Sequence, residues 1–360
     1  MELVFMNNPV IITVDVGYGT TTCVHKESLG NYSVKTFPSL PIPIKSDINL
    51  GLAGEERDVT NVEVDGITYE VGSDVGTSVG SRNVRVLNTE SFITSDRYKA
   101  LLFGALSFLG KSNHIDIDVL VLGLPVSVMF RKDELAKIYT GTHQITPSRK
   151  VTIRQVLVFE QPLGALMSFL RQGGNERFAQ CKDKTMLSID PGYMTTDFIT
   201  SKGLKVSPNR SGDSETGMSK VIGAVEVALR SQLEGFNIKQ INPELIDQAF
   251  ISGELKLYGK AMKFPKCDLF DVTSAIRSVT DEALTSVVNK VGDGQDIDLI
   301  IVSGGAAAVY LPSIQRAFPF HKIEVVDDSL TAVARGLQTA GEQFIRGAIA
   351  RGDYQKLKAV

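Results

Sequence analysis

Two short stretches of the chain repeat one pattern of an aspartate, a glycine turn and a pair of threonines. They are VDVGYGTTT at residues 14–22 and IDPGYMTTD at residues 189–197. In each, the aspartate ends an apolar run typical of a buried β-strand, where an ionised carboxylate is costly unless a partner meets it. The N–H groups of a glycine turn can surround phosphate oxygens, and Mg²⁺ binds phosphates alongside one or two carboxylates while it keeps several waters. The repeat therefore predicts two turns that hold a triphosphate from opposite sides, with Mg²⁺ between the phosphates and Asp15 and Asp190.

A single copy of this pattern has a second interpretation, a plain β-hairpin whose aspartate is satisfied locally. Two copies in one chain weaken that interpretation. The pattern also differs from the glycine pattern of dinucleotide-binding folds, which opens a helix, because here an extended segment follows the turn. The chain has no Gly-x-x-x-x-Gly-Lys-Ser/Thr sequence, so a P-loop is excluded.

A third stretch, LIIVSGGAAAVY at residues 299–310, is a buried strand that ends in Ser303, Gly304 and Gly305 and enters a helix. Small residues at such a turn let a flat ring or a phosphate approach the backbone, and a helix N-terminus favours anions. A turn that needs its glycines only for packing is the alternative.

The rest of the chain alternates strands with helices. We expect a hairpin at residues 10–25, an irregular stretch at 37–61 and a second hairpin around Asp65-Gly66, whose residue pair is a strong hairpin signal. Helical patterns cover residues 96–109, 162–172, 216–233, 271–291 and 329–345, and apolar strands cover 118–126, 151–159 and 298–302. This alternation predicts an α/β protein with covered sheets, and the long internal repeat predicts two related domains that face one another.

Composition narrows the class of protein. The net charge of −3 argues against direct binding to nucleic acid or to an anionic membrane. No apolar run approaches the roughly 20 residues of a membrane span, and the first residues lack the basic region of a signal peptide. Three scattered cysteines and four scattered histidines form no metal or disulfide pattern. We therefore expect a protein of the reducing cytoplasm.

Five stretches resemble the motifs of the actin-like ATPases, and they follow one another along the chain in the order typical of that family. VDVGYGTTT and IDPGYMTTD resemble the two phosphate motifs, VSGGAAAVY the adenosine motif, and VFEQPLGAL and DDSLTAVARGL the two connecting helices. VDGITYEVGSDV, DRYKALLFGAL and VLGLPV are similar to segments of the plasmid-segregation actins of the ParM/StbA type, and the resemblance extends to the member of that type in the PRTRC module.

The resemblance implies the fold shared by actin, sugar kinases and heat-shock ATPases, with a nucleotide cleft between two domains. Domain I would comprise residues 1–161 and 335–360, with an outer subdomain at about 37–95. Domain II would comprise 162–334, with an outer subdomain at about 220–295. It also implies ATP-driven filaments of this chain that segregate plasmid DNA through a DNA-bound adaptor protein.

The site residues implied by the resemblance lie on the same motifs. Asp15 and Asp190 would hold Mg²⁺ through water. Asp15 would contact the nucleotide through this Mg²⁺. The phosphates of ATP or ADP would be bound by Gly17, Gly19, Thr20 and Thr21 and by Gly192, Thr195 and Thr196, the nucleoside by Gly212, Glu215 and Gly217, and the adenosine by Gly304, Gly305 and Ala306.

Hydrolysis requires a group that orients the attacking water, because phosphoryl transfer depends mostly on positioning and charge stabilisation. Glu160 and Gln161 are the candidates. Actins place a glutamine and many bacterial relatives a glutamate at this point, and Gln161 aligns better. Glu160 stays open as the alternative, as does a purely structural role for Glu160 at a helix N-terminus.

Two rival functions share this fold. A monomeric phosphotransferase of the sugar-kinase or exopolyphosphatase type would need a further aspartate base, for which the chain offers no clear candidate. A cytoskeletal scaffold that binds ATP without hydrolysis is equally compatible with the motifs.

Overall fold

The computed structural model describes residues 9–26, 31–44, 57–75, 89–110, 112–236 and 238–353. The chain forms two compact units. Unit 1 comprises residues 1–175 and 331–360, and unit 2 comprises residues 176–330. Parts of the predicted outer subdomain of domain I, at 45–56 and 76–88, and residues 354–360 of domain I lie outside the described residues.

Unit 1 is built on a six-stranded mixed sheet in the order β3-β2-β1-β7-β9-β8. Its strands are β1 (Ile11–Val16), β2 (Thr20–Lys26), β3 (Tyr32–Pro38), β7 (His114–Leu124), β8 (Gly141–Thr146) and β9 (Arg149–Glu160). The hairpin β1–β2 is antiparallel, whereas β1, β7 and β9 are parallel. The predicted first hairpin and the two apolar strands that follow it are confirmed.

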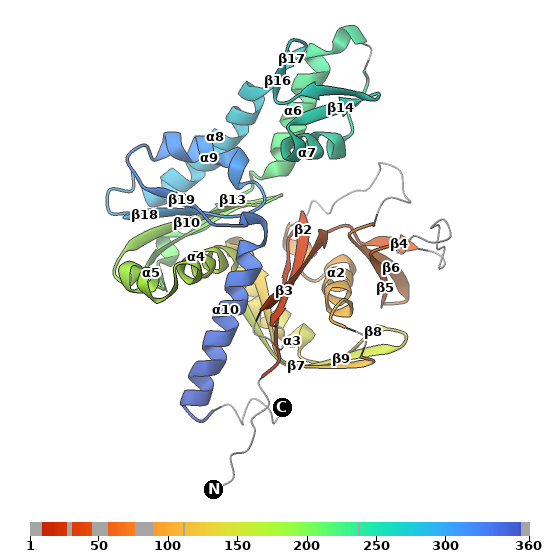
Figure 1. Ribbon diagram of the computed structural model, residues 1–360, viewed down its shortest axis with the longest axis vertical. Coiled ribbons are helices and arrows are strands. Elements are labelled where there is room, and N and C mark those ends of the chain that lie inside the picture. Colours follow the sequence, from red (N-terminus) through yellow and green to blue (C-terminus); the bar gives the residue numbers. More distant parts are fainter. Residues whose placement is uncertain are drawn as a thin grey trace. The chain divides into compact units, whose positions relative to one another are not determined.

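Helices α4 (Gln161–Gln172) and α10 (Ser329–Ala350) run beside this sheet (Figure 1). Val119 and Val121 of β7 form a buried cluster with Ala165 of α4 and Leu337 of α10. Pro162 lies in the first turn of α4, and Gly173 ends the helix, as the sequence predicts. This packing holds the N-terminus of α4 at the same end of the sheet as the C-terminus of β1.

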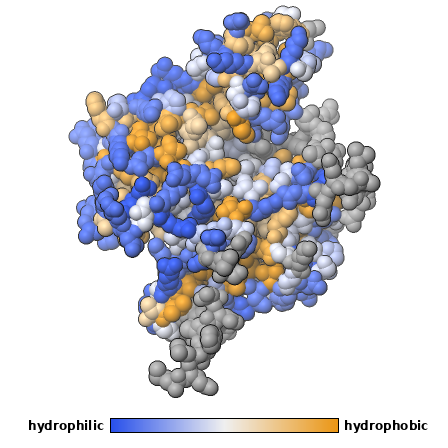
Figure 2. Space-filling view, in the orientation of Figure 1, coloured by the Kyte–Doolittle hydropathy of each residue, from blue (hydrophilic) through white to orange (hydrophobic). Residues whose placement is uncertain are grey.

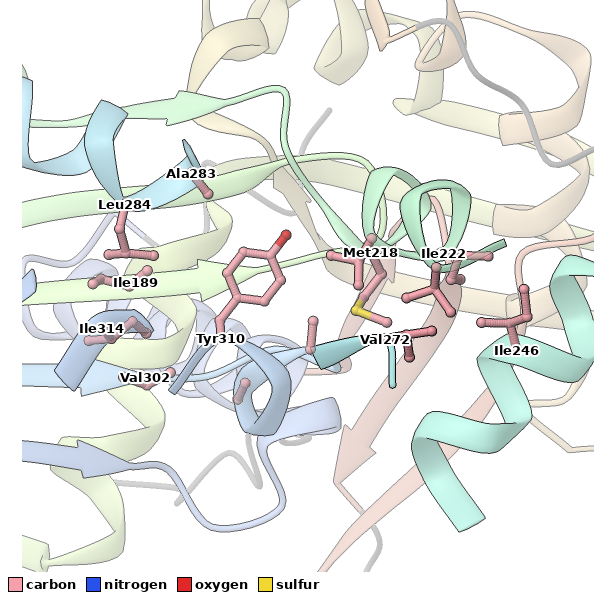
Figure 3. Packing of buried hydrophobic residues seen from close by; sticks show 14 of the residues in the cluster. Ile189, Met218, Ile222, Ile246, Val272, Ala283, Leu284, Val302, Tyr310 and Ile314 are labelled. Atoms are coloured by element: carbon pink, nitrogen blue, oxygen red, sulfur yellow. The ribbon is translucent and has the colours of Figure 1, made fainter. Parts of the chain in front are cut away.

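Unit 2 is built on a second mixed sheet in the order β12-β11-β10-β18-β19, with β13 paired to β11. Its strands are β10 (Thr185–Pro191), β11 (Thr196–Lys202), β12 (Lys205–Val206), β13 (Gly212–Ser214), β18 (Leu299–Val302) and β19 (Ile323–Val325). Helices α6 (Met218–Gln232), α8 (Thr273–Val291) and α9 (Ala307–Ala317) pack with it around one core. In Figure 3, Tyr310 of α9 lies in this core between Leu284 and Ile189 on one side and Met218 on the other.

The two sheets repeat one topology. In each, two antiparallel pairings are followed by two parallel ones, β3-β2-β1-β7-β9 in unit 1 and β12-β11-β10-β18-β19 in unit 2. The repeated sequence pattern occupies the same place in both, the hairpin β1–β2 and the hairpin β10–β11. The predicted α/β fold of two related domains is confirmed.

A three-stranded sheet, β4-β6-β5, adds to unit 1. It comprises β4 (Ile42–Ile44), β5 (Val59–Val64) and β6 (Ile67–Gly72). Asp65 and Gly66 both have positive φ, 49° and 80°, as the favoured two-residue hairpin turn requires, so this prediction is confirmed.

The expectation that residues 37–61 are irregular is wrong at both ends of the stretch. Residues 37–38 belong to β3, residues 42–44 form β4, and residues 59–61 begin β5, while 45–56 lie outside the described residues. Pro43 lies within β4, although proline usually interrupts a strand. A strand at a sheet edge tolerates proline, because one row of its backbone groups needs no ladder partner, and β4 is such an edge.

The other elements complete the two units. Unit 1 also contains α1 (Thr89–Phe92), α2 (Asp96–Ser107), α3 (Lys132–Tyr139) and the 3₁₀ turn η1 (Val126–Arg131); α5 (Gly174–Cys181) links the units. Unit 2 also contains α7 (Pro243–Ser252), β14 (Glu254–Leu257), β15 (Lys260–Lys263), β16 (Lys266–Cys267), β17 (Phe270–Asp271) and the 3₁₀ turns η2 (Pro208–Arg210) and η3 (Glu234–Phe236). Among the described helices, none is long and apolar enough to cross a membrane.

Candidate nucleotide-binding site

The first glycine turn joins β1 to β2 and is closed by a backbone hydrogen bond. The Gly17 N–H donates to the Thr20 carbonyl over 3.0 Å. A Cβ on Gly17 would lie 2.9 Å from that oxygen, so the turn requires glycine. Ser39 holds the turn: its N–H donates to the Gly19 carbonyl over 3.0 Å and its hydroxyl to the Gly17 carbonyl over 2.6 Å. Ser39 was not singled out from the sequence, because its contact depends on how β3 continues.

The threonines of the first turn are placed differently. Thr20 is half-buried, and its hydroxyl bonds to no residue in the described ranges. Thr21 is fully buried, and its hydroxyl shares a 2.9 Å hydrogen bond with Ser39. Thr20 therefore has the hydroxyl that a phosphate could use, while that of Thr21 supports the turn.

Asp15 lies beside Gln161 at one end of the unit 1 sheet. The Gln161 amide Nε2 donates to Asp15 Oδ1 over 2.8 Å. Burial raises the pKa of Asp15 to about 6, and the hydrogen bond from Gln161 opposes the rise. Gly123 of β7 makes the pair possible, because a Cβ there would lie 2.6 Å from Asp15 Oδ1 and 3.1 Å from Gln161 Cγ. Gly123 interrupts the apolar strand predicted at residues 118–126, and a glycine inside an apolar strand is a signal of such a close approach.

Glu160 ends β9 and immediately precedes α4. Its backbone is extended, with φ −64° and ψ 133°, and its side chain makes no cap hydrogen bond to the helix. The carboxylate is half-buried and pairs with no described residue. Of the two neighbouring candidates, Gln161 is thus engaged with Asp15, while Glu160 has its carboxylate available.

The second glycine turn repeats the first. The Gly192 N–H donates to the Thr195 carbonyl over 2.8 Å, and a Cβ on Gly192 would lie 3.1 Å from that oxygen. The two threonine hydroxyls are both used within unit 2. Thr195 donates to Asp197 Oδ2 over 2.6 Å, and Thr196 donates to a backbone carbonyl over 2.8 Å. The N–H groups of the turn that follow Gly192 are therefore the better candidates for phosphate contacts.

Asp190 is the last residue but one of β10, is buried, and meets the turn between β18 and α9. The Ser303 hydroxyl donates to Asp190 Oδ1 over 2.8 Å. Gly304 has φ +85°, and a Cβ there would lie 2.6 Å from the same oxygen. A larger residue at 304 would displace the carboxylate. The local sequence marks Ser303 only as the end of a strand, because the parallel pairing of β10 with β18 that brings it to Asp190 is non-local.

The start of α9 is tied to the same turn. The Ala306 N–H donates to the Pro191 carbonyl over 3.2 Å, and Ala306 is buried. Gly305 is exposed. The adenosine contacts of Gly304, Gly305 and Ala306 stay a prediction.

The helix predicted at residues 216–233 is confirmed as α6, and its N-terminus contacts the second turn. The Met218 N–H donates to the Gly192 carbonyl over 3.1 Å. A Cβ on Gly217 would lie 2.6 Å from the Tyr193 carbonyl oxygen. Gly212 lies in β13, and the side chain of Glu215 is exposed. The nucleoside contacts of Gly212, Glu215 and Gly217 stay a prediction.

Two family models match most of this framework. A model of the N-terminal domain of actin-like proteins matches residues 13–164. A model of the C-terminal part of archaeal actin homologues of the MreB-like type matches residues 188–315. The two matches include both glycine turns, with Asp15 in the first and Asp190 in the second.

The chain is an actin-like protein.

Solved structures with the same fold agree with this assignment. The crystal structure of Ta0583, an archaeal actin homologue, has a TM-score of 0.73 and 19% sequence identity, and the match covers 93% of this chain and 99% of Ta0583. Ta0583 has also been crystallised with ADP, with a TM-score of 0.70, 19% identity and the same coverage. A 15-stranded ParM filament from Clostridium botulinum has a TM-score of 0.71 and 20% identity over 94% of this chain and 100% of ParM. At these identities the likeness shows the fold. No curated protein sequence matches the chain.

The described residues of this actin-like protein suit Mg²⁺ better than a metal held by protein alone. Among them, no group of three His, Cys, Asp or Glu side chains could hold a metal ion. Asp15 and Asp190 are single carboxylates, and each has a glycine, Gly123 or Gly304, against it. Mg²⁺ uses one or two carboxylates together with phosphate oxygens and water. The donor set therefore fits Mg²⁺ that arrives with a nucleotide.

Proposed function

We propose that this actin-like protein binds Mg-ATP through its two glycine turns and hydrolyses it to ADP and phosphate. The observation that carries the proposal is the matched pair of turns, in which Gly17 donates to Thr20 over 3.0 Å and Gly192 donates to Thr195 over 2.8 Å, each beside a strand-end aspartate. A duplicated turn of backbone N–H groups beside a carboxylate suits phosphate with a divalent cation. The ADP complex of Ta0583 supports it.

Within this proposal, Asp15 and Asp190 hold Mg²⁺ through water. When bound, Mg²⁺ would neutralise phosphate charge. Gln161 fixes the orientation of Asp15 through its 2.8 Å hydrogen bond, and Ser303 does the same for Asp190. These two donors keep the carboxylates in place before nucleotide binds.

Glu160 is the better candidate for orienting the attacking water. Its carboxylate pairs with no residue among those described, and it lies next to Gln161 in the chain. A carboxylate can accept a hydrogen bond from water and align it with the γ-phosphate, which is what phosphoryl transfer requires of the protein. Gln161 is then a positioning residue.

We further propose that the ATP-bound chain assembles into filaments that segregate plasmid DNA through a DNA-bound adaptor protein. The similar structures include a ParM filament and an Alp12 filament. A phosphotransferase of the same fold and a scaffold without hydrolysis remain the rival functions.

Two measurements on the same sample distinguish the filament-forming ATPase from the phosphotransferase and from the scaffold. Light scattering and phosphate release are followed together after Mg-ATP is added to purified protein, with the Asp190→Ala variant as the control that loses Mg-ATP binding. Scattering that rises and then decays as phosphate appears is the expected result. Phosphate release with flat scattering at every protein concentration would favour a phosphotransferase, and stable scattering without phosphate would favour a scaffold.

A further inference from the structure

The hairpin β14–β15 of unit 2 has a tyrosine in a strained position at its tip. Tyr258 has φ 49° and is followed by Gly259 with φ 79°. The hairpin β5–β6 makes a turn of the same kind with Asp65 and Gly66. Aspartate tolerates the left-handed conformation because its short polar side chain can bond to nearby backbone, whereas a bulky residue there is an outlier.

Burial of the Tyr258 side chain within the chain does not offset this strain. Its residue surface is 84% exposed, so the ring buries little apolar area in the free chain. A residue held in a sparsely populated backbone region costs on the order of 1–3 kcal/mol. Asn or Asp at position 258 would make the same turn more stable. The presence of tyrosine is explained if its ring packs against something outside the chain.

The surface around Tyr258 is basic. Lys256, Lys260 and Lys263 are exposed on the two strands, and Glu254 is the single acidic residue from 254 to 263. The whole chain has a net charge of −3, so the remainder of the chain is more acidic than the total. Figure 2 shows apolar residues at the surface of the part of unit 2 that carries α7 and β14, where Ile251 is 85% exposed.

We infer that the β14–β15 hairpin docks on an acidic surface of a second copy of this chain, with the Tyr258 ring as its central contact. The inference rests on the proposed assembly into filaments. Two copies of a basic hairpin repel, so the contact joins the hairpin to a different surface of the neighbour. A contact between unlike surfaces repeats along an open chain of subunits rather than closing a two-fold dimer. Tyrosine is one of the residues enriched at the few positions that carry most of the binding energy of a protein interface.

The variant Tyr258→Asn tests the inference, because asparagine suits the turn. We expect its melting temperature to equal or exceed that of the wild type. We expect the critical concentration for Mg-ATP-driven assembly, measured by sedimentation, to rise about tenfold or more, as removal of an interface anchor does. Affinity for a fluorescent ATP analogue should stay within about twofold, below 0.5 kcal/mol.

A charge reversal gives a second, independent readout. Lys256→Glu with Lys263→Glu should weaken assembly, whereas the matched change Lys182→Glu with Lys205→Glu, elsewhere in unit 2, should not. Assembly of Tyr258→Asn at the wild-type critical concentration would overturn the inference and leave the proposed function standing. Wild-type protein that never assembles would overturn both. Fluorescence anisotropy with a single-stranded oligonucleotide tests whether the hairpin binds nucleic acid instead. Oligonucleotide binding that depends on Tyr258, together with unchanged assembly of the Tyr258→Asn variant, would refute the inference.

Discussion

Gln161 Nε2 donates to Asp15 Oδ1 over 2.8 Å, which joins the first residue of α4 to the end of β1. The two residues are 146 positions apart in the chain. The pair fits because Gly123, on the neighbouring strand β7, has no side chain to fill the space. This hydrogen bond orients the Asp15 carboxylate, and it also occupies the Gln161 amide nitrogen as a donor.

Gly123→Ala should separate this pair. The added Cβ would start 2.6 Å from Asp15 Oδ1, so the carboxylate must move, and overpacking of this kind destabilises by about 1–3 kcal/mol. We expect ATP-analogue affinity to fall about tenfold, which is 1.4 kcal/mol, as measured by titration. Gly223→Ala is the matched control: position 223 in α6 is exposed with nothing within 4 Å of an added Cβ, and alanine there should stabilise by about 0.5–1 kcal/mol. Equal affinity in both variants would contradict this role of Gly123.

Asp15→Asn should stabilise the nucleotide-free and metal-free protein at neutral pH. Burial raises the pKa of Asp15 from 3.8 to about 6, so the folded state binds a proton more tightly than the unfolded state. Stability from this group therefore increases as pH falls from above 6 to below 4. Asparagine removes this partly buried charge, and a shift of this size corresponds to about 3 kcal/mol at most. Urea unfolding should show the variant more stable at pH 7.5 and equal to the wild type near pH 4; a variant less stable at pH 7.5 would exclude this assignment.

The Glu160→Gln and Gln161→Ala variants should both slow hydrolysis while ATP binding is largely spared. Glu160→Gln keeps the size of the side chain and removes the charge that orients water, so kcat should fall about 100-fold, in the range of general acid–base contributions. Gln161→Ala removes the donor to Asp15, so its kcat should fall less and its affinity should fall slightly. Phosphate release and nucleotide titration measure both quantities. Normal hydrolysis by both variants would show that neither residue positions the water.

Gly336→Ala should disrupt the packing of α4 against α10. A Cβ at position 336 would lie 1.7 Å from the Gly164 carbonyl oxygen and 2.7 Å from the Ser168 nitrogen, and backbone atoms cannot rotate away. We expect a loss of about 3 kcal/mol or more in the free energy of unfolding, at the upper end for overpacked sites. Gly347→Ala on the same helix meets only the end of the Arg351 side chain at 3.2 Å and should be neutral or stabilising. Equal thermal stability of the two variants would contradict the close approach.

The contacts of the site that no local sequence pattern predicts are those that depend on which strands are neighbours in the sheets. Ser303 reaches Asp190 because β18 lies parallel to β10, and Gly123 faces Asp15 because β7 lies parallel to β1. Parallel partners come from distant parts of the chain, so no local pattern shows which residues will be opposite each other.

The sequence by itself determined the α/β class, the two related halves and the two glycine turns, because the alternation of apolar residues and the turn residues act locally. The Asp65-Gly66 hairpin and the start of α4 at Pro162 follow from the same local chemistry. Only the tertiary structure decided that Pro43 lies in an edge strand. It also decided that the hydroxyl of Thr21 is hydrogen-bonded to Ser39, and that Gln161 rather than Glu160 bonds to Asp15. Those outcomes depend on which side chains the register of the sheets brings within hydrogen-bonding distance, and register is a property of the packed chain.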